Sequence, residues 1–156
     1  MKQIRKTVRI QAPSSRVFEY ITQPSNFLEV WPSMVEVSNA KRAADGTNSF
    51  DWVYKMGGMH HRGHAESKKV TTNQYLEVHN TGSIPSTFRW NLRGRDDTTD
   101  VTLEIEYDIP IPLLGKFAES FLIKLNDREA DALLANLKER LDVTQRSSIP
   151  TGAPAH

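Results

Sequence analysis

Apolar and polar residues alternate along much of the chain, which is the pattern of β-strands that bury one face. The clearest example covers residues 101–109, where Val101, Leu103, Ile105, Tyr107 and Ile109 alternate with threonine, glutamate and aspartate. Short turns containing Gly, Asp or Pro separate most of the other alternating stretches, so we expect an antiparallel meander. The predicted strands cover 2–10, 35 to the turn at 44–47, 49–56, 59–70, 75–80, 87–92 and 101–109.

In three segments the spacing of apolar residues changes to that of an α-helix. Residues 14–22 and 26–30 predict two short helices, and Trp31-Pro32 ends the second because a residue before proline avoids the helical region. Residues 113–141 predict one long helix with an apolar stripe that Glu129 and Asn136 interrupt. Residues 145–156 lack periodicity, so we expect one domain over 1–144 and a disordered tail.

These elements predict an α+β domain. A sheet of about seven strands with one apolar face needs a cover, and the long C-terminal helix is the only element large enough to supply it. We therefore expect a curved antiparallel sheet around that helix, with the two short helices after the first strand.

Composition narrows the possible functions. The chain has 156 residues and a formal net charge of +1. This balance gives no basic stripe for nucleic acid. No apolar run is long enough for stable membrane insertion, and the first residues lack the apolar region of a secretory signal. The absence of cysteine excludes thiolate chemistry and fits a cytoplasmic location.

Several local motifs resemble the START-like, or SRPBCC, superfamily. They are the opening strand that runs into Ile10-Gln11-Ala12-Pro13, the Trp31-Pro32 pair, and the final helix ending LLANLKERL. The resemblance covers residues 3–141 and implies the helix-grip fold, with an apolar cavity between sheet and helix. Because the superfamily includes lipid carriers, polyketide cyclases and chaperone cofactors, it specifies fold better than function.

The resemblance also implies which side chains line the cavity. The alternation within 50–56 puts two aromatic rings, an indole and a thioether on one face, a pattern that by itself is more typical of a solid core. The residues expected to contact a ligand are Phe50, Trp52, Tyr54, Met56, Phe88, Trp90, Leu103, Ile105, Tyr107, Phe117, Phe121 and Leu125.

The histidines of the strand over 59–70 have the wrong spacing for a metal site. His60 and His64 share a face but stand about 13 Å apart, and His61 faces the other way. His61 is a weak candidate for a proton carrier at the cavity mouth. A solvated or hydrogen-bonded surface histidine is the commoner situation. We expect His61, Gly63 and Ala65 to face inward; the alternative parity would bury Arg62 with Glu66.

Catalytic residues are harder to assign. Tyr54 and Glu129 are candidates, but no clear acid–base pair converges on the apolar face. For Glu129 the usual situation would be pairing with Lys124 or Arg128 along the helix flank.

Three functions remain open. The favoured one is binding or transport of an apolar small molecule such as a lipid, quinone or polyketide, without a cofactor or metal. The second is a cyclase or dehydratase that uses the same cavity. The third is a protein-interaction domain with an exposed apolar patch near Ile111–Leu114.

Overall fold

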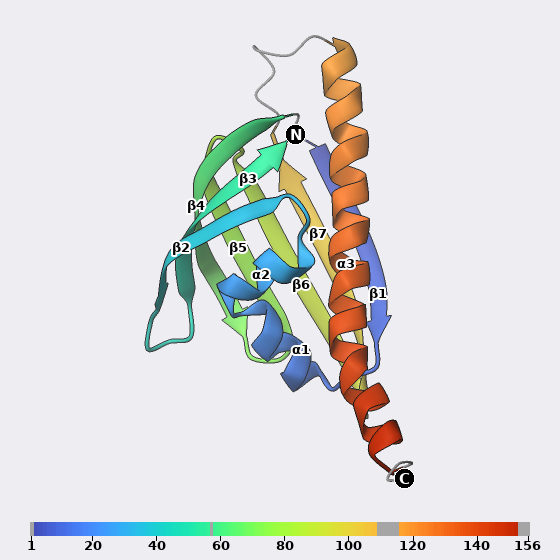
Figure 1. The fold of residues 1–156 in the computed structure, drawn as a ribbon. Helices are drawn as coiled ribbons and strands as arrows, with labels where there is room; N and C mark the ends of the chain where they lie inside the picture. Colours follow the sequence, from blue (N-terminus) through green and yellow to red (C-terminus); the bar gives the residue numbers. More distant parts are fainter. Residues whose placement is uncertain (1, 57, 109–115, 153–156) are drawn as a thin grey trace.

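The computed structural model describes the backbone of residues 2–56, 58–108 and 116–152, and the side chains of residues 2–56, 58–108 and 123–142 (Figure 1). Its seven strands form one antiparallel sheet in the order β1-β7-β6-β5-β4-β3-β2. Every predicted strand is present. The strands are β1 (Lys2–Ile10), β2 (Met34–Arg42), β3 (Asn48–Met56), β4 (Met59–Thr71), β5 (Tyr75–Gly82), β6 (Ser86–Arg95) and β7 (Thr98–Tyr107).

Two of the connections follow directly from local sequence. Asp45-Gly46 lies in the turn between β2 and β3, where Gly46 has φ of +89° and therefore occupies the left-handed region that glycine tolerates. Pro32 ends the helical segment before β2, and Trp31 already has extended backbone angles. The start of β2 and the turn between β2 and β3 therefore follow from the backbone preferences of proline and glycine.

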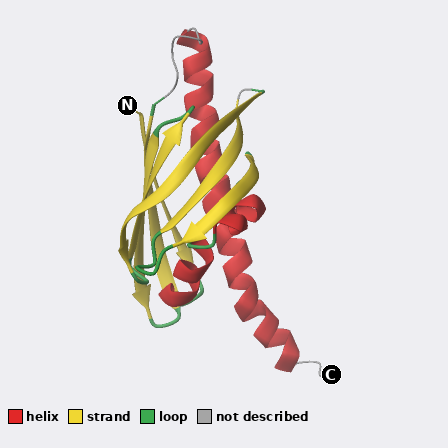
Figure 2. Ribbon diagram, turned by 90° about the vertical axis from the view of Figure 1, so that its left-hand side faces the viewer, coloured by secondary structure: helices red, strands yellow, loops and turns green. Residues whose placement is uncertain are grey.

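The helices cover one face of the curved sheet (Figure 2). The short elements are α1 (Ser14–Ile21), the 3₁₀ turn η1 (Pro24–Asn26) and α2 (Phe27–Val30). The long helix α3 (Lys116–Gly152) contacts β1 and α2. Its buried stripe consists of Ala130, Leu133, Leu134, Leu137 and Leu141. This arrangement confirms the predicted α+β helix-grip fold.

The long helix ends later than the sequence predicted. Its apolar stripe stops at Leu141, but the backbone stays helical to Gly152 and includes part of the segment 145–156 for which we expected disorder. Figure 2 shows this end of α3 projecting beyond the sheet. The stripe therefore marks the part of the helix that packs on the sheet rather than the end of the helix. None of the helices in the described part of the chain is both long and apolar enough to cross a membrane.

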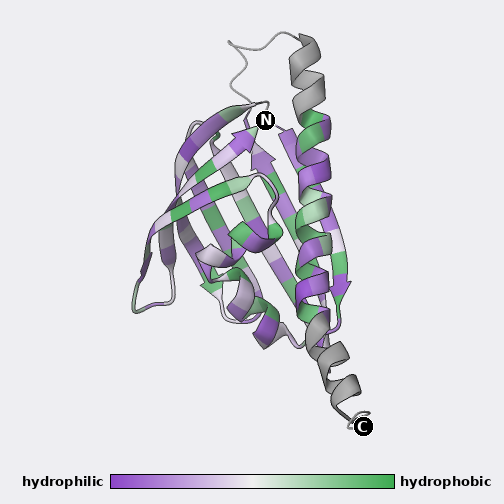
Figure 3. Cartoon of the chain, viewed as in Figure 1, coloured by the Kyte–Doolittle hydropathy of each residue, from purple (hydrophilic) through white to green (hydrophobic). Residues whose placement is uncertain are grey.

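Hydrophobic and hydrophilic residues alternate along the strands (Figure 3), and the hydrophobic ones are buried on one face of the sheet. In β7, Val101, Leu103, Ile105 and Tyr107 are buried, whereas the intervening Thr102, Glu104 and Glu106 are only partly buried. The strict alternation in this part of the sequence thus predicted correctly which side chains of β7 are buried. The buried residues face α3 and the short helices.

The orientation of β4 is also as predicted. Ala65 is fully buried, and Arg62 and Glu66 are exposed, so the alternative of a buried Arg62–Glu66 pair is wrong. Gly63 lies opposite Trp52 in the sheet register. A Cβ at position 63 would lie 2.6 Å from Trp52 Cε2, and closer still to Cζ2. Glycine at this position therefore makes room for the indole.

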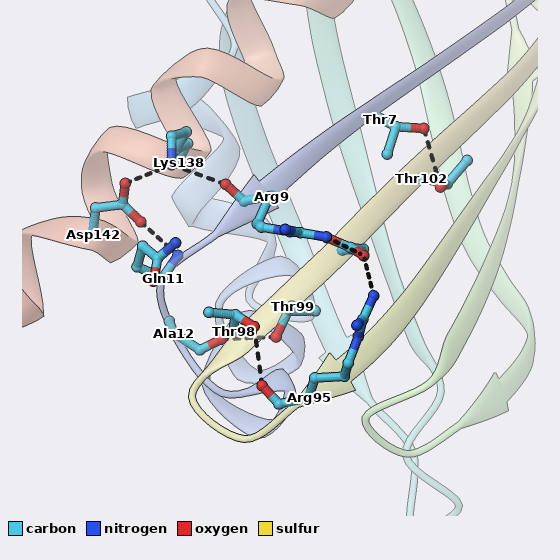
Figure 4. A network of polar contacts seen from close by, with 11 residues as sticks. Thr7, Arg9, Gln11, Ala12, Arg95, Thr98, Thr99, Thr102, Lys138 and Asp142 are labelled. Carbon is cyan, nitrogen blue, oxygen red and sulfur yellow. Dashed lines mark hydrogen bonds and ion pairs between the residues drawn. The ribbon is translucent and has the colours of Figure 1, made fainter.

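Polar contacts fix α3 to the end of β1 (Figure 4). The Gln11 N–H donates to Asp142 Oδ1 at 2.7 Å, and Lys138 Nζ donates to the Arg9 carbonyl at 2.9 Å. Lys138 also pairs with Asp142 at 2.8 Å. In the neighbouring strand, the fully buried Thr99 donates its hydroxyl to the Ala12 carbonyl at 2.7 Å. These bonds set the position of α3 across the sheet, and hence the space left between them.

Candidate functional site

A cavity of about 110 Å³ lies between the sheet, the short helices and α3, measured as the space open to the centre of a water-sized sphere. One water molecule needs roughly 10–15 Å³ in this measure, so the space exceeds that of an ordinary packing defect. Its wall is mainly apolar. The predicted ligand contacts that line it are Phe50, Trp52, Tyr54, Met56, Phe88, Trp90, Ile105 and Tyr107.

The remaining predicted contacts lie elsewhere. Leu103 is fully buried in the core and does not line the cavity, because its sheet neighbour Lys6 is bonded to Asp127 of α3 and the helix closes over this row. Leu125 packs against the core outside the cavity wall. The side chains of Phe117 and Phe121, and the apolar segment 111–114, lie outside the described residues.

An aromatic cluster that the sequence analysis did not assign to the cavity surrounds Trp31. The Trp31 ring lies 5.6 Å from that of Tyr54, nearly edge-on at 79°, and 5.3 Å from that of Phe88. Phe27, one turn earlier in α2, lies 6.2 Å from Trp90. Such separations suit aromatic pairs. The helical spacing of Phe27 and Trp31 was visible in the sequence, but it did not show what that helix face covers.

Tyr54 and Glu129 meet in the cavity wall. The Tyr54 hydroxyl donates to Glu129 Oε1 at 3.4 Å and accepts a hydrogen bond from Trp31 Nε1 at 3.3 Å. Burial, followed by the nearby Glu129 carboxylate, raises the pKa of the Tyr54 phenol. The phenol therefore stays neutral and acts as a hydrogen-bond donor at ordinary pH.

This contact corrects one prediction. The expected pairing of Glu129 with Lys124 or Arg128 is wrong, because its carboxylate bonds the Tyr54 hydroxyl and the Ser33 N–H instead. The Ser33 N–H donates to Glu129 Oε1 at 3.0 Å, which turns the carboxylate toward the sheet. A backbone N–H outside a helix or sheet needs another acceptor, and the Ser33 N–H lies in the bend just after Pro32.

Asn136, the other polar residue in the α3 stripe, has a related role. Its Nδ2 donates to the Val30 carbonyl at 2.9 Å. Glu129 and Asn136 therefore bond the backbone on either side of Trp31-Pro32. Together they hold the aromatic side chain of Trp31 against the cavity.

A second polar group lies on the sheet side of the cavity. Trp52 Nε1 donates to Asn80 Oδ1 at 3.1 Å, and Asn80 Nδ2 donates to Ser86 Oγ at 3.1 Å. Both Asn80 and Ser86 line the cavity. The sequence analysis did not assign them, although the alternation that put Phe88 and Trp90 inward applies equally to Ser86.

Tyr107 differs from the other polar side chains of the wall. It is 4% exposed and lines the cavity. Among the residues that the structure describes, nothing forms a hydrogen bond with its hydroxyl group, which is itself buried.

The histidines of β4 lie on both faces. His61 is opposite Tyr54 on the inner face, but its Nε2 is 3.3 Å from the Met56 carbonyl and the residue does not line the cavity. His64 is on the outer face, with Nδ1 2.7 Å from Asp51 Oδ1. Hydrogen bonds from Asn39 and then from His64 lower the pKa of the Asp51 carboxyl. In the described part of the chain, no three acidic or histidine side chains are grouped as a metal site requires.

Solved structures with the same fold come from several bacteria. The protein TTHA0849 from Thermus thermophilus is 20% identical, with a TM-score of 0.79 over 92% of this chain and 99% of its own. A START superfamily protein from Mycobacterium smegmatis is 14% identical, with a TM-score of 0.75 over 91% and 98%. The Zhui aromatase/cyclase from Streptomyces sp. R1128 is 15% identical, with a TM-score of 0.73 over 88% and 92%. At these identities the likeness establishes the fold only.

Sequence comparison identifies the family. A search of curated proteins gives no match. The family model described as polyketide cyclase / dehydrase and lipid transport matches residues 1–142, nearly the whole described chain. The sheet, the covering helix and the apolar cavity agree with that match. The protein is therefore a member of the polyketide cyclase/dehydrase and lipid transport family.

Proposed function

We propose that the protein binds a flat, largely apolar small molecule in the cavity between the sheet and α3. The observation that carries this proposal is the cavity wall itself. It includes all three tryptophans of the chain, together with Phe27, Phe50 and Phe88, around a space of about 110 Å³. An apolar ligand would leave water for a surface of aromatic faces, and burial of apolar area drives such binding.

The polar side chains of the wall support a ligand rather than a filled core. A core can be completed with aliphatic residues, whereas each buried polar group needs a partner. Tyr54, Asn80, Ser86 and Glu129 all line this cavity. Apolar pockets with a few placed polar groups are typical of small-molecule sites, in which the polar groups set the orientation of the ligand.

Native mass spectrometry of the purified protein, followed by solvent extraction, tests the proposal. We expect either a retained apolar compound or saturable binding of the hydrophobic fluorophore 1-anilinonaphthalene-8-sulfonate, with quenching of tryptophan fluorescence. Ala130→Leu adds bulk at a buried position in the wall and should weaken binding. Ala135→Leu places the same side chain on the exposed side of α3 and is the matched control. An empty protein that binds no fluorophore, or equal binding by both variants, would contradict the proposal.

A second function, cyclase or dehydratase chemistry, is favoured by one observation. The Glu129 carboxylate and the neutral Tyr54 hydroxyl lie 3.4 Å apart in the wall. In the reaction we propose, Glu129 takes a proton from a carbon next to a carbonyl of the substrate, and Tyr54 donates a hydrogen bond to the resulting enolate oxygen. The enolate carbon then attacks a second carbonyl, and Glu129 returns its proton to the alkoxide that forms, which gives a hydroxyl. Glu129, again a carboxylate, takes the remaining hydrogen from the same carbon and delivers it to that hydroxyl, which leaves as water while the carbon–carbon double bond forms.

Proton abstraction can be measured without knowing the substrate. The ketone 1-tetralone, incubated with the protein in D₂O, should exchange its α-hydrogens faster than in buffer. Glu129→Gln keeps an oxygen for the Ser33 N–H but is a far weaker base, so it should bind the ketone and lose the acceleration. Equal exchange rates for the two proteins at saturating ketone would rule out this role and leave the binding function standing.

A further inference from the structure

A groove at the β2–β3 hairpin adjoins the cavity and differs from it in character. Charged, hydroxyl and amide side chains line most of the groove, whereas the cavity wall is mainly apolar. Asn48 and Ser67 line both spaces, and the Asn48 N–H donates to Ser67 Oγ at 3.1 Å. These two residues therefore form a boundary between the apolar cavity and the polar groove.

Arg42 is the cation of this groove that lies on the cavity side of the sheet. It is directly opposite Asn48 in the register of β2 and β3, and opposed residues of antiparallel strands share a face. The residue is exposed, and its side chain forms no hydrogen bond or ion pair with the described residues. The guanidinium group thus keeps its planar set of N–H donors, which suits the oxygens of an anion.

The other charged residues of the groove already have opposite charges beside them. Glu66 pairs with Lys68 Nζ at 3.0 Å. Lys41 is opposite Ser49 on the outer face, where its charge interacts with that of Asp51. Arg42 is therefore the charge that the groove leaves available.

We propose that Arg42 and the Ser67 hydroxyl bind an anionic group of the ligand. The ligand would then be an amphipathic anion, with an apolar body in the cavity and a carboxylate, sulfate or phosphate group in the groove. This inference rests on the proposed binding function. Ser67 Oγ accepts a hydrogen bond from Asn48 and still has its own proton to donate.

The division between the two spaces matches the energetics of such a molecule. An ion is costly to bury without a partner, and the open groove lets the charged group keep contact with water. The apolar body gains free energy by leaving water for the cavity. A structural alternative exists for Arg42, because exposed cations on an edge strand such as β2 also discourage association between sheets.

Two fluorophores that differ in one charged group test the inference. The first, 1-anilinonaphthalene-8-sulfonate, carries a sulfonate, and N-phenyl-1-naphthylamine is the same ring system without it. In fluorescence titrations of the intact protein, Arg42→Gln should weaken sulfonate binding roughly two- to fivefold, the effect of one partly exposed ion pair. Binding of the neutral amine should not change. The effect of the substitution should shrink as salt is added, because salt screens exposed charges.

Arg62→Gln is the matched control. Arg62 is also exposed, lies opposite Val53 on the outer face of β4, and lines neither the groove nor the cavity. Its replacement removes the same charge from the other face of the sheet, and should change neither affinity. Equal weakening of sulfonate binding by both variants would mean that overall charge is responsible, and would overturn the inference.

Inorganic phosphate has the charge without the apolar body. We expect it to displace the sulfonate only at far higher concentrations than those at which the sulfonate itself binds. Competition at comparable concentrations would make the groove a site for free anions, and the inference would be wrong.

The outcomes separate this inference from the function on which it rests. If neither fluorophore binds, the proposed function and the inference fail together. If both bind and Arg42→Gln changes neither affinity, or weakens both equally, the cavity binds ligands and only the anion site is wrong. A loss confined to the sulfonate and to Arg42→Gln supports both.

Discussion

Substitution of Gly63 by alanine tests whether close packing against Trp52 shapes the cavity. Gly63 lies on the inner face of β4, and its φ is outside the left-handed region, so alanine can adopt the same backbone conformation. On backbone grounds alone, Gly63→Ala should stabilise the strand by about 0.5–1 kcal/mol. The packing at this position predicts the opposite sign.

The magnitude follows from what the new methyl group would meet. It would lie 2.6 Å from Trp52 Cε2, and also against the Thr81 carbonyl oxygen. The indole would have to move, although it is only 7% exposed and donates to Asn80. Overpacking costs about 1–3 kcal/mol, and a disturbed hydrogen bond adds about 1 kcal/mol. After the backbone gain is subtracted, we expect a net loss of about 1–3 kcal/mol in the free energy of unfolding.

Urea denaturation followed by far-ultraviolet circular dichroism measures that loss. Gly94→Ala is the matched control, because its methyl group would meet mainly the side chain of Ser14, at 2.9 Å and 3.1 Å, which is small and partly exposed. The control should change stability by less than about 1 kcal/mol. If Gly63→Ala is as stable as the unsubstituted protein, or more stable, the reasoning about Trp52 is refuted. Because Trp52 lines the cavity, the variant should also bind 1-anilinonaphthalene-8-sulfonate more weakly.

Two further predictions concern polar contacts. Asn136→Ala should lower the free energy of unfolding by about 1–3 kcal/mol, because the carbonyl of the buried Val30 loses its donor. Asn136→Asp, which cannot donate a hydrogen bond when ionised, should show a similar loss of stability in urea denaturation. Hydrogen bonds from Asn39 and then His64 lower the folded-state pKa of the Asp51 carboxyl. The ionised carboxylate should therefore contribute its full stabilisation above the unfolded carboxyl pKa of about 3.9. That stabilisation should be lost as the pH falls through the lower folded-state pKa. Asp51→Asn should reduce that part of the pH dependence, and an unchanged acid unfolding profile would contradict the assignment.

The sheet was predictable because its determinants are local. The alternation in residues 101–109 fixed which face of β7 is buried, and Asp45-Gly46 marked a turn that glycine alone enters easily. Small residues on β4 indicated its inner face correctly, because Ala65 and Gly63 lie opposite the large side chains of β3. None of these inferences needed knowledge of distant parts of the chain.

The cavity wall was only partly predictable, because its composition depends on where α3 crosses the sheet. Leu103 and Ile105 have the same orientation in β7, yet only Ile105 lines the cavity. The difference lies in α3, which bonds Lys6 through Asp127 and so covers the row that contains Leu103. Alternation along one strand cannot reveal how far a helix extends over it.

Glu129 shows the same limit for polar residues. Its spacing in α3 was compatible with pairing along the helix, and the sequence offered cationic neighbours at Lys124 and Arg128. Its actual partners, the Ser33 N–H and the Tyr54 hydroxyl, come from segments 96 and 75 residues away in the chain. Only the docking of α3 beside the Trp31-Pro32 bend brings them together.

The polar groups of the cavity wall carry different weight as evidence for a ligand. Glu129 and Asn136 bond the backbone on either side of Trp31-Pro32, and Tyr54 bonds Glu129, so these side chains hold Trp31 in place with or without a ligand. Trp52 and Asn80 likewise satisfy each other. Tyr107 is not explained in this way: among the described residues, its hydroxyl is the one buried side-chain polar atom without a partner. A phenylalanine would complete a solid core at that position without an unsatisfied donor. Packing alone therefore does not account for this hydroxyl.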